Sequence, residues 1–366
     1  MNISITKTDL LHALSVVSKG MSSHSTLPIL SGILLEAGEK MLTLQTTDLE
    51  NSIRCTVPAF IEEPGKTVVP GKLFGDIIKA LPDAAIQFTT NSGHLVIRCL
   101  ESEFTLNTLD AQDFPQFPSI SATREVKLPV ARLSTMVQQV LKAVSKDEHR
   151  MILTGILITV NDKDISLVAT DSYRLAVSEV ELVSPAAIDF SVIVPGHLFG
   201  DIIKATASDD ELSIGVADNQ IIFSSQDSTY ITRKIEGNYP NYKQLIPTDH
   251  TLSAIVDTKD LIDTVRRISL LSQSNSSIRL QFSSSDQVIE ISSQTQDVGT
   301  ASERIKAQIE GEDMEIAFNH RFIIDGLSTI ASETTLIELQ DFKKPGIFKS
   351  MGVDRSLYLA MPVRLG

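Results

Sequence analysis

Few groups of residues in this 366-residue sequence have the types and spacing that catalysis would need. Asp162 and Asp164 flank a lysine, and close carboxylates are typical ligands of a two-metal site. They lie between two predicted strands, which favours a solvated hairpin turn. Gly65-Lys66-Thr67 resembles the end of a phosphate-binding loop, but Phe60 stands where the leading glycine should be, and a strand follows where that loop needs a helix. We predict a turn at these three residues.

Other signs of enzyme chemistry are missing. The sequence has no GxSxG, HExxH or GxGxxG pattern, which would indicate a nucleophile, a zinc ion or a dinucleotide. None of the seven histidines has a second ligand at metal-binding spacing. Cys55 and Cys99 lack CxxC spacing, so we expect both as buried thiols in strands. The sequence thus predicts no catalytic residue, no metal and no cofactor, which favours a binding or structural protein over an enzyme.

A cation followed four positions later by aspartate recurs at corresponding positions of three similar stretches. Residues 70–80, PGKLFGDIIKA, return at 195–205 as PGHLFGDIIKA, with ten of eleven positions identical, and 319–331, NHRFIIDGLSTIA, form a fainter third copy. Matches this long, about 125 residues apart, indicate an internal duplication. The recurring pairs are Lys72 and Asp76, His197 and Asp201, and Arg321 and Asp325.

The repeated stretch has the pattern of an amphipathic helix. A period of 3.6 residues separates the charged positions from an apolar face that consists of Leu73, Phe74, Ile77, Ile78 and Leu81. Val68-Val69 is predicted to end the preceding strand. Pro70 suits the first helical turn, where its missing N–H costs nothing. The apolar face is explained by packing, but packing does not explain a cation on the outer face.

The rest of the chain repeats the same arrangement of helices and strands. The predicted strand ILTGILITV at 152–160 matches ILSGILLEA at 29–37, and Thr170-Asp171 matches Thr47-Asp48. We predict an α+β fold of three similar domains, each with two helices backed by antiparallel sheets. The three domains are expected to span residues 1–124, 125–249 and 250–366. No long linker is expected between them.

Charge is distributed unevenly over these elements. The chain has a net charge of −14, whereas the six predicted helix windows (7–19, 70–81, 129–145, 195–206, 257–271 and 319–331) together carry +4, so the remainder carries −18. If the helices share one side, that side suits phosphate while the outer strands repel it. The alternative is that the helices simply carry surface charges, with Asp76, Asp201 and Asp325 cancelling their neighbours.

Two further stretches contain residues that packing alone does not explain. Residues 169–177, ATDSYRLAV, place an aromatic residue and an arginine after a Thr-Asp turn. Residues 358–366, YLAMPVRLG, end the chain in apolar residues, where many chains end in frayed polar ones. An exposed Met, Leu and Pro surface often binds partner peptides, although a last edge strand tucked into its sheet would look the same.

Together these motifs resemble the bacterial β sliding clamp family, the processivity factors of DNA polymerase III. The resemblance runs the whole length and rests on ILTGIL (152–157), ATDSYRLA (169–176), EGNYPNYKQLIP (236–247), FNHRFIIDGL (318–327) and AMPVRL (360–365). It implies the DNA-clamp fold and a head-to-tail homodimer that closes into a ring. Double-stranded DNA would pass through the ring without sequence specificity during DNA replication.

The resemblance also implies the partners. A clamp loader would open the ring, and the ring would then tether the polymerase. The replicative polymerase alpha subunit, the clamp-loader delta subunit and other proteins with a clamp-binding motif are the expected partners. The clamp itself would catalyse no reaction. Its classification as a DNA-directed DNA polymerase (a nucleotidyltransferase) would come from the holoenzyme to which it belongs.

The family's partner-peptide cleft and other surfaces carry over by position. The expected cleft residues are Leu153, Thr170, Ser172, Tyr173, Arg174, Leu175, Pro240, Leu245, Gly346, Leu359, Met361, Pro362, Val363 and Arg364. The family often has Gly-His where this sequence has Ser172-Tyr173. This difference is expected to affect which peptide is preferred more than whether a peptide binds. The expected DNA-facing residues are His24, Lys72, Lys79, Arg132, Lys142, His197, Lys204, Arg266 and Arg321. The expected dimer interface residues are Phe104, Leu106, Leu270 and Leu271.

Two other classes of function stay open at this point. One is a metal-dependent nucleotidyl-transfer enzyme or nuclease, and the other is an adaptor that binds peptides but not DNA. The sequence has no apolar run of about 18 residues and no signal peptide, so we expect a cytoplasmic protein that does not bind membranes.

Overall fold

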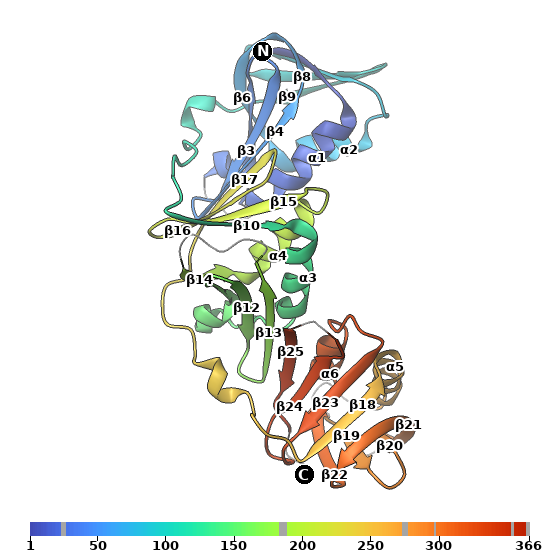
Figure 1. Ribbon diagram of the computed structural model, residues 1–366. Helices are drawn as coiled ribbons and strands as arrows, with labels where there is room; N and C mark the ends of the chain where they lie inside the picture. The colour runs from blue at the N-terminus through green and yellow to red at the C-terminus, as the bar shows by residue number, and fades with distance from the viewer. Residues whose placement is uncertain (23–26, 183–188, 273–276, 296–297, 353–354, 364–366) are drawn as a thin grey trace. The chain divides into compact units, whose positions relative to one another are not determined.

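The computed structural model describes residues 1–22, 27–182, 189–272, 277–295, 298–352 and 355–363 (Figure 1). Two compact units account for the chain. The first consists of Met1–Leu133 and Asp201–Lys234, and the second of Ser134–Gly200 and Ile235–Gly366.

Six α-helices occur in the described residues, as the sequence predicted. In the first unit α1 (Lys7–Val17) packs against α2 (Gly71–Ala80), and in the second α5 (Thr258–Ser269) packs against α6 (His320–Leu327). The other two, α3 (Val130–Leu141) and α4 (Gly196–Ala205), each contain residues of both units. None of the helices within the described ranges is long and apolar enough to cross a lipid bilayer.

The repeated stretch forms α2 with the predicted buried stripe and two differences. Phe74, Ile77 and Ile78 are buried, and the Phe74 ring lies 5.6 Å from that of Phe88 on the sheet beneath. Leu73, predicted to be on this face, is half exposed, because it lies about 100° around the helix from Phe74. Pro70 is the extended N-cap residue rather than the first helical residue.

The first unit contains two antiparallel sheets. The five-stranded sheet has the order β5-β1-β7-β8-β9, with β1 (Asn2–Ile5), β5 (Phe60–Glu63), β7 (Ile86–Asn91), β8 (His94–Cys99) and β9 (Ser102–Asn107). The eight-stranded sheet has the order β10-β15-β16-β17-β4-β3-β2-β6, with β2 (Gly32–Ala37), β3 (Met41–Thr47), β4 (Asn51–Pro58), β6 (Gly65–Pro70), β10 (Arg124–Pro129), β15 (Glu211–Val216), β16 (Gln220–Ser224) and β17 (Ser228–Arg233). Pairing of β17 with β4 joins strands of the first and second sequence repeats into one sheet.

The second unit contains one sheet of twelve strands. Its order is β14-β11-β12-β13-β25-β24-β23-β18-β21-β20-β19-β22. The strands are β11 (Gly155–Val160), β12 (Asp164–Thr170), β13 (Arg174–Glu181), β14 (Phe190–Pro195), β18 (Leu252–Asp257), β19 (Ser277–Ser283), β20 (Val288–Thr295), β21 (Gly299–Gly311), β22 (Met314–Asn319), β23 (Thr334–Leu339), β24 (Gly346–Ser350) and β25 (Arg355–Ala360). Here β13 of the second repeat pairs with β25 of the third.

The predicted strand at 152–160 begins too early. Its first three residues belong to a 3-10 segment, Glu148–Thr154, and β11 starts only at Gly155. The Thr154 hydroxyl donates to the Met151 carbonyl at 2.7 Å, a local bond that competes with the strand ladder. The first repeat has the same arrangement, since Ser31 donates to Pro28 at 2.7 Å before β2.

The turn predicted at Gly65-Lys66-Thr67 is wrong. These residues open β6, where Lys66 lies opposite Glu36 of β2 and forms an ion pair with it at 2.7 Å. The cross-strand pair stabilises an extended backbone. Asp162 does lie in a hairpin turn between β11 and β12, as predicted, and both cysteines are buried in strands.

Candidate functional site

The loop between β12 and β13 is held by its own side chains. Asp171 accepts hydrogen bonds from the backbone N–H groups of Tyr173 and Arg174 at 2.9 and 3.0 Å, and the Thr170 hydroxyl accepts from the Ser172 N–H at 3.1 Å. Ser172 has a left-handed φ of 78°. Thr47 and Asp48 build the same turn in the first repeat, with Leu49 at a φ of 77°. The Thr-Asp pair therefore stabilises the same turn in both repeats. Tyr173 and Arg174 are the residues that distinguish the second copy of this turn from the first.

Arg174 connects this loop to α6. Its guanidinium donates to Asp171 at 2.9 Å and to Asp325 at 2.6 Å, and lies 4.6 Å from the centre of the Phe322 ring. The side chain is only 10% exposed. Arg174 is thus already neutralised by two carboxylates and acts as a support of the site rather than as a free cation.

Apolar side chains beside the loop form one buried cluster. Val168, Leu175, Val177 and Leu359 are buried together, and half-buried residues pack around them, namely Leu157, Tyr239, Tyr242, Ile246 and Leu357. Leu175 lies directly opposite Leu359 in the β13–β25 ladder. We call this set the apolar floor.

Exposed apolar residues lie near this floor. Tyr173 is 60% exposed, and Leu245, Met361 and Pro240 are exposed as well. The Met361 N–H donates to the Tyr173 carbonyl at 2.8 Å, which extends the pairing of β13 and β25 by one bond. The Tyr173 ring stacks at 6.3 Å on that of Phe322. An apolar floor with exposed apolar neighbours is a suitable surface for a short peptide with apolar anchors.

The remaining predicted cleft residues have different positions. Leu153 and Gly346 are buried, and a Cβ on Gly346 would lie 2.7 Å from the Phe318 ring, so close packing explains this glycine. Pro362 and Val363 are half-buried, and Arg364 lies outside the described residues. Sequence reasoning missed Phe322, Tyr239, Tyr242 and Ile246. The last three lie in the motif at 236–247, and their apolar character could have indicated that they belong to the site.

Every described DNA-facing candidate is exposed. These residues are Lys72, Lys79, Arg132, Lys142, His197, Lys204, Arg266 and Arg321, while His24 lies outside the described residues. Lys204 lies 4.0 Å from Asp201, and Arg266 lies 3.5 Å from Asp263. Lys72, Lys79 and Lys142 form no ion pair with any residue in the described ranges, so their charge is available to a phosphate.

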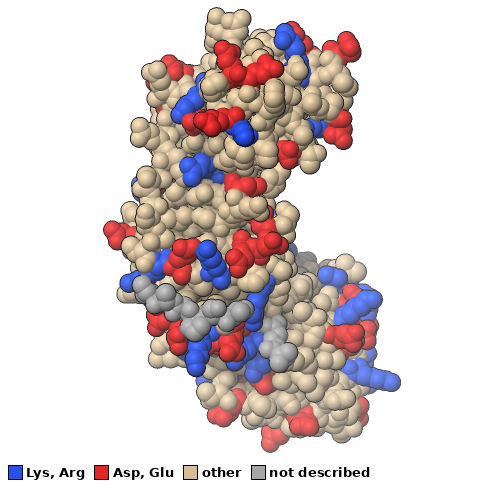
Figure 2. Space-filling view, turned by 45° about the horizontal axis from the view of Figure 1, so that its top comes forward, with Lys and Arg blue, Asp and Glu red and all other residues tan. Residues whose placement is uncertain are grey.

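The aspartates of the repeated helices do not all act as expected. Asp325 accepts from Arg174 rather than balancing Arg321, and Asp201 lies 3.4 Å from Lys19 of the first repeat. Both carboxylates therefore hold neighbouring elements together. Figure 2 shows acidic and basic side chains interspersed over the face in view, with no broad region of one sign.

The predicted dimer interface residues lie on two elements. Phe104 is exposed on β9, an edge strand of its sheet, whereas Leu106 of the same strand is buried. Leu270 caps α5 and is 84% exposed, and Leu271 is half-buried. An edge strand offers unpaired backbone groups, and an exposed leucine offers apolar area.

Comparison with known proteins identifies the class. Three sequence families match in order along the chain: the N-terminal domain of the DNA polymerase III beta subunit at residues 1–118, its central domain at 127–241 and its C-terminal domain at 243–364. The chain is thus of the DNA polymerase III beta subunit class.

Individual relatives agree with this class. The beta sliding clamp of Streptomyces coelicolor is 34% identical and that of Synechocystis sp. 33% identical, each match covering 100% of both chains. The solved DNA polymerase sliding clamp of Bacillus subtilis superposes with a TM-score of 0.94 at 30% identity, and the beta subunit from Thermotoga maritima with 0.93 at 26%, each again over 100% of both chains. The chain belongs to the beta sliding clamp family, and its function is that of a non-catalytic sliding clamp.

Proposed function

We propose that two copies of this chain form a closed, head-to-tail ring around duplex DNA and tether the replicative polymerase to it. The observation that carries this proposal is the set of exposed lysines on α2 and at the end of α3 in an otherwise acidic chain of this family. Lys72, Lys79 and Lys142 are exposed and unpaired among the described residues, and the chain as a whole has a net charge of −14.

The charge distribution suits sliding rather than gripping. Phosphate contacts carry no base information, and each contact adds to a salt-dependent affinity. A few separated cations attract the DNA backbone weakly, and an acidic remainder disfavours wrapping on the outside. Retention on DNA then depends on closure of the ring and not on affinity.

The apolar floor and the exposed residues near it form the proposed partner site. The polymerase alpha subunit, the clamp-loader delta subunit and other proteins with a clamp-binding motif would insert an apolar peptide against Leu175 and Leu359, beside Tyr173 and Met361. The support for this proposal is that the floor is apolar and that exposed apolar side chains lie close to it.

We further propose three clamp domains, at 1–124, 125–249 and 250–366, and a dimer interface that uses Phe104 and Leu106 of one chain against Leu270 and Leu271 of the other. The exposure of Leu270 and Phe104 supports the interface. A role in replication places the working protein in the cytoplasm with the DNA.

Primer extension tests the proposal. The cognate polymerase and clamp loader, on a primed circular template with Mg²⁺ and ATP, should give long products only when the chain is present. The purified chain alone should incorporate no nucleotide. Incorporation by the chain alone, lost in an Asp162→Ala/Asp164→Ala variant, would instead favour a metal-dependent enzyme, although Asp164 already forms an ion pair with Arg355 at 3.1 Å. Product lengths that do not change on adding the chain would contradict the tether.

A further inference from the structure

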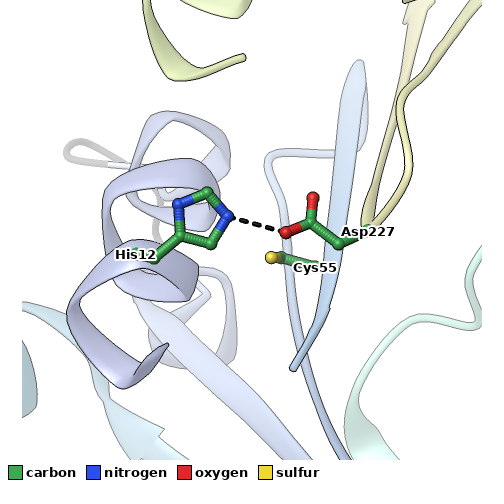
Figure 3. Close-up of side chains that lie close together, drawn as sticks. All are labelled: His12, Cys55 and Asp227. Carbon is green, nitrogen blue, oxygen red and sulfur yellow. Dashed lines mark hydrogen bonds and ion pairs between the residues drawn. The ribbon is translucent and has the colours of Figure 1, made fainter. Parts of the chain in front are cut away.

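Three side chains with metal-ligating atoms converge in the first unit (Figure 3). His12 comes from α1, Cys55 from β4 and Asp227 from the turn between β16 and β17. The His12 Nε2 atom lies 2.7 Å from the Asp227 Oδ2 atom, and the ligand atoms of all three residues lie within 4.8 Å of one another. The β4–β17 pairing, which sets Ser228 opposite Cys55, creates this cluster, so linear spacing could not indicate it.

The three donor atoms are an imidazole nitrogen, a sulfur and a carboxylate oxygen. This set suits Zn²⁺, which accepts all three, and it does not suit Mg²⁺ or Ca²⁺, which prefer oxygen ligands alone. Three protein ligands also leave one tetrahedral position for water. The donor set therefore selects a borderline-soft divalent cation.

An ion can reach the cluster from solvent. His12 and Asp227 are about one-third exposed, and both line an open cavity of about 800 Å³. Cys55 is completely buried behind them. Four carboxylates line the same cavity, from Asp9, Glu36, Asp209 and Asp227, against the guanidinium of Arg54 and the Lys66 ammonium that pairs with Glu36. A cavity with this excess of negative charge attracts cations.

A buried polar group beside the cluster lacks a partner. Tyr230 of β17 is 1% exposed, and its hydroxyl has no hydrogen-bond partner among the described residues. Tyr230 lies two residues beyond Ser228 on the same face of β17, and the Ser228 hydroxyl donates to Asp227 at 2.6 Å and lies 3.6 Å from the Cys55 Sγ atom. Buried polar groups without a partner are rare and costly, and a metal-bound water is one group that could satisfy it.

We propose that His12, Cys55 and Asp227 form a binding site for one Zn²⁺ ion per chain, with water as the fourth ligand. On binding, the Cys55 Sγ–H proton leaves to solvent, and the neutral His12 ring takes the tautomer with its proton on Nδ1, so that Nε2 is free to bind. The contact between His12 and Asp227 is then replaced by a bond from each to the metal. The ion ties α1 of the first repeat to the β16–β17 turn of the second. The site is separate from the apolar floor and does not depend on ring closure.

Metal binding by the untagged, metal-free, full-length protein tests this proposal. Competition with a chromophoric zinc chelator should give one Zn²⁺ per chain, and Co²⁺ should give the thiolate-to-cobalt charge-transfer band. A thiol must lose its proton to bind the ion, so about one proton should be released per ion at neutral pH. Zn²⁺ should also raise the melting temperature.

The variants Cys55→Ser, His12→Gln and Asp227→Asn should each weaken Zn²⁺ binding by at least tenfold. Loss of a residue that merely holds a metal ligand in place already lowers metal affinity by about 10 to 100-fold. Cys99→Ser is the matched control, because Cys99 is the other buried cysteine of this unit, and it should bind as the wild type does. His12→Gln changes a partly exposed side chain, so this variant should keep the fold. Circular dichroism checks that it does.

Three results would overturn the site: wild-type protein that fails to bind Zn²⁺ at micromolar concentration, binding unchanged in the folded His12→Gln variant, or bound Co²⁺ without a thiolate band. In each case the His12–Asp227 contact would be an ion pair only. None of these measurements uses DNA or a partner peptide, so their failure leaves the proposed clamp function untouched.

Discussion

At the scale of single residues, Arg174 shows how the candidate cleft is supported. Its guanidinium lies between Asp171 and Asp325 and over the Phe322 ring, and its side chain is nearly buried. A partly buried ion pair of this kind need not be stabilising compared with apolar residues, but removing one member leaves unpaired charges behind.

Arg174→Ala should therefore lower the free energy of unfolding by about 3–5 kcal/mol, the usual result of breaking a buried pair. Arg304→Ala is the matched control, because Arg304 pairs with Glu290 at an exposed position, and this variant should lose far less stability. Urea unfolding of both variants measures the difference. Equal losses would contradict the supporting role of Arg174.

Tyr173 is different, because its side chain is largely exposed and its loss exposes no buried group. Tyr173→Ala should leave the melting temperature unchanged and raise the Kd of a polymerase-derived peptide by about tenfold or more, as loss of an aromatic anchor usually does. Fluorescence anisotropy measures the Kd. Phe60→Ala removes an equally exposed aromatic from the first unit, and a similar effect there would remove Tyr173 from the site.

At the scale of elements, the C-terminal segment completes the site through its backbone. The Met361 N–H donates to Tyr173, and the Val363 N–H donates to Ala317. A deletion of residues 361–366 should abolish peptide binding, because it removes an exposed apolar neighbour of the floor and loosens the loop. The native mass should stay that of a dimer in sedimentation. An unchanged peptide Kd would refute the cleft assignment.

The end of α5 belongs to the proposed dimer interface. Leu270→Asp combined with Leu271→Asp should convert the dimer to monomers in sedimentation, since it places charge in an apolar interface. Leu49→Asp adds a charge at another exposed leucine, in the first unit, and should leave the dimer intact. A dimer that survives the double substitution would require a different interface.

Much of this arrangement was predictable because the chain repeats itself. The near-identity of 70–80 and 195–205, with the fainter third copy, predicted three of the six α-helices, and the helix windows at 7–19, 129–145 and 257–271 predicted the other three. Apolar periodicity failed where local side-chain bonds decide the backbone, as at Thr154. The turn predicted at Gly65-Lys66-Thr67, after a phosphate-binding loop had been rejected there, was wrong for another reason: a cross-strand ion pair of Lys66 stabilises a strand.

The site was harder to predict than the fold. Tyr173 and Met361 stood out as unexplained apolar residues, but the role of Phe322 depends on a stacking contact with a loop about 150 residues away in sequence. The convergence of His12, Cys55 and Asp227 likewise follows from strand pairing between repeats, and no linear motif records it.

At the scale of the whole molecule, function depends on how charge is divided. The chain is acidic overall, yet Lys72 and Lys79 on α2 and Lys142 just after α3 are exposed and form no ion pair among the described residues. Many weak contacts with phosphates let a protein move along DNA, and a closed ring prevents it from leaving. The central claim is therefore topological: the protein stays on DNA because it encircles it.

Linearisation of loaded DNA tests that claim most directly. The chain is loaded by the clamp loader onto a nicked circular plasmid, isolated with the DNA by gel filtration, and then treated with an enzyme that cuts the plasmid once. We predict that the protein stays with the circle at raised salt and is lost within minutes after the cut, while the Leu270→Asp/Leu271→Asp variant is never retained. Protein that remains on the linear DNA, or that never stays on the circle, would contradict the ring.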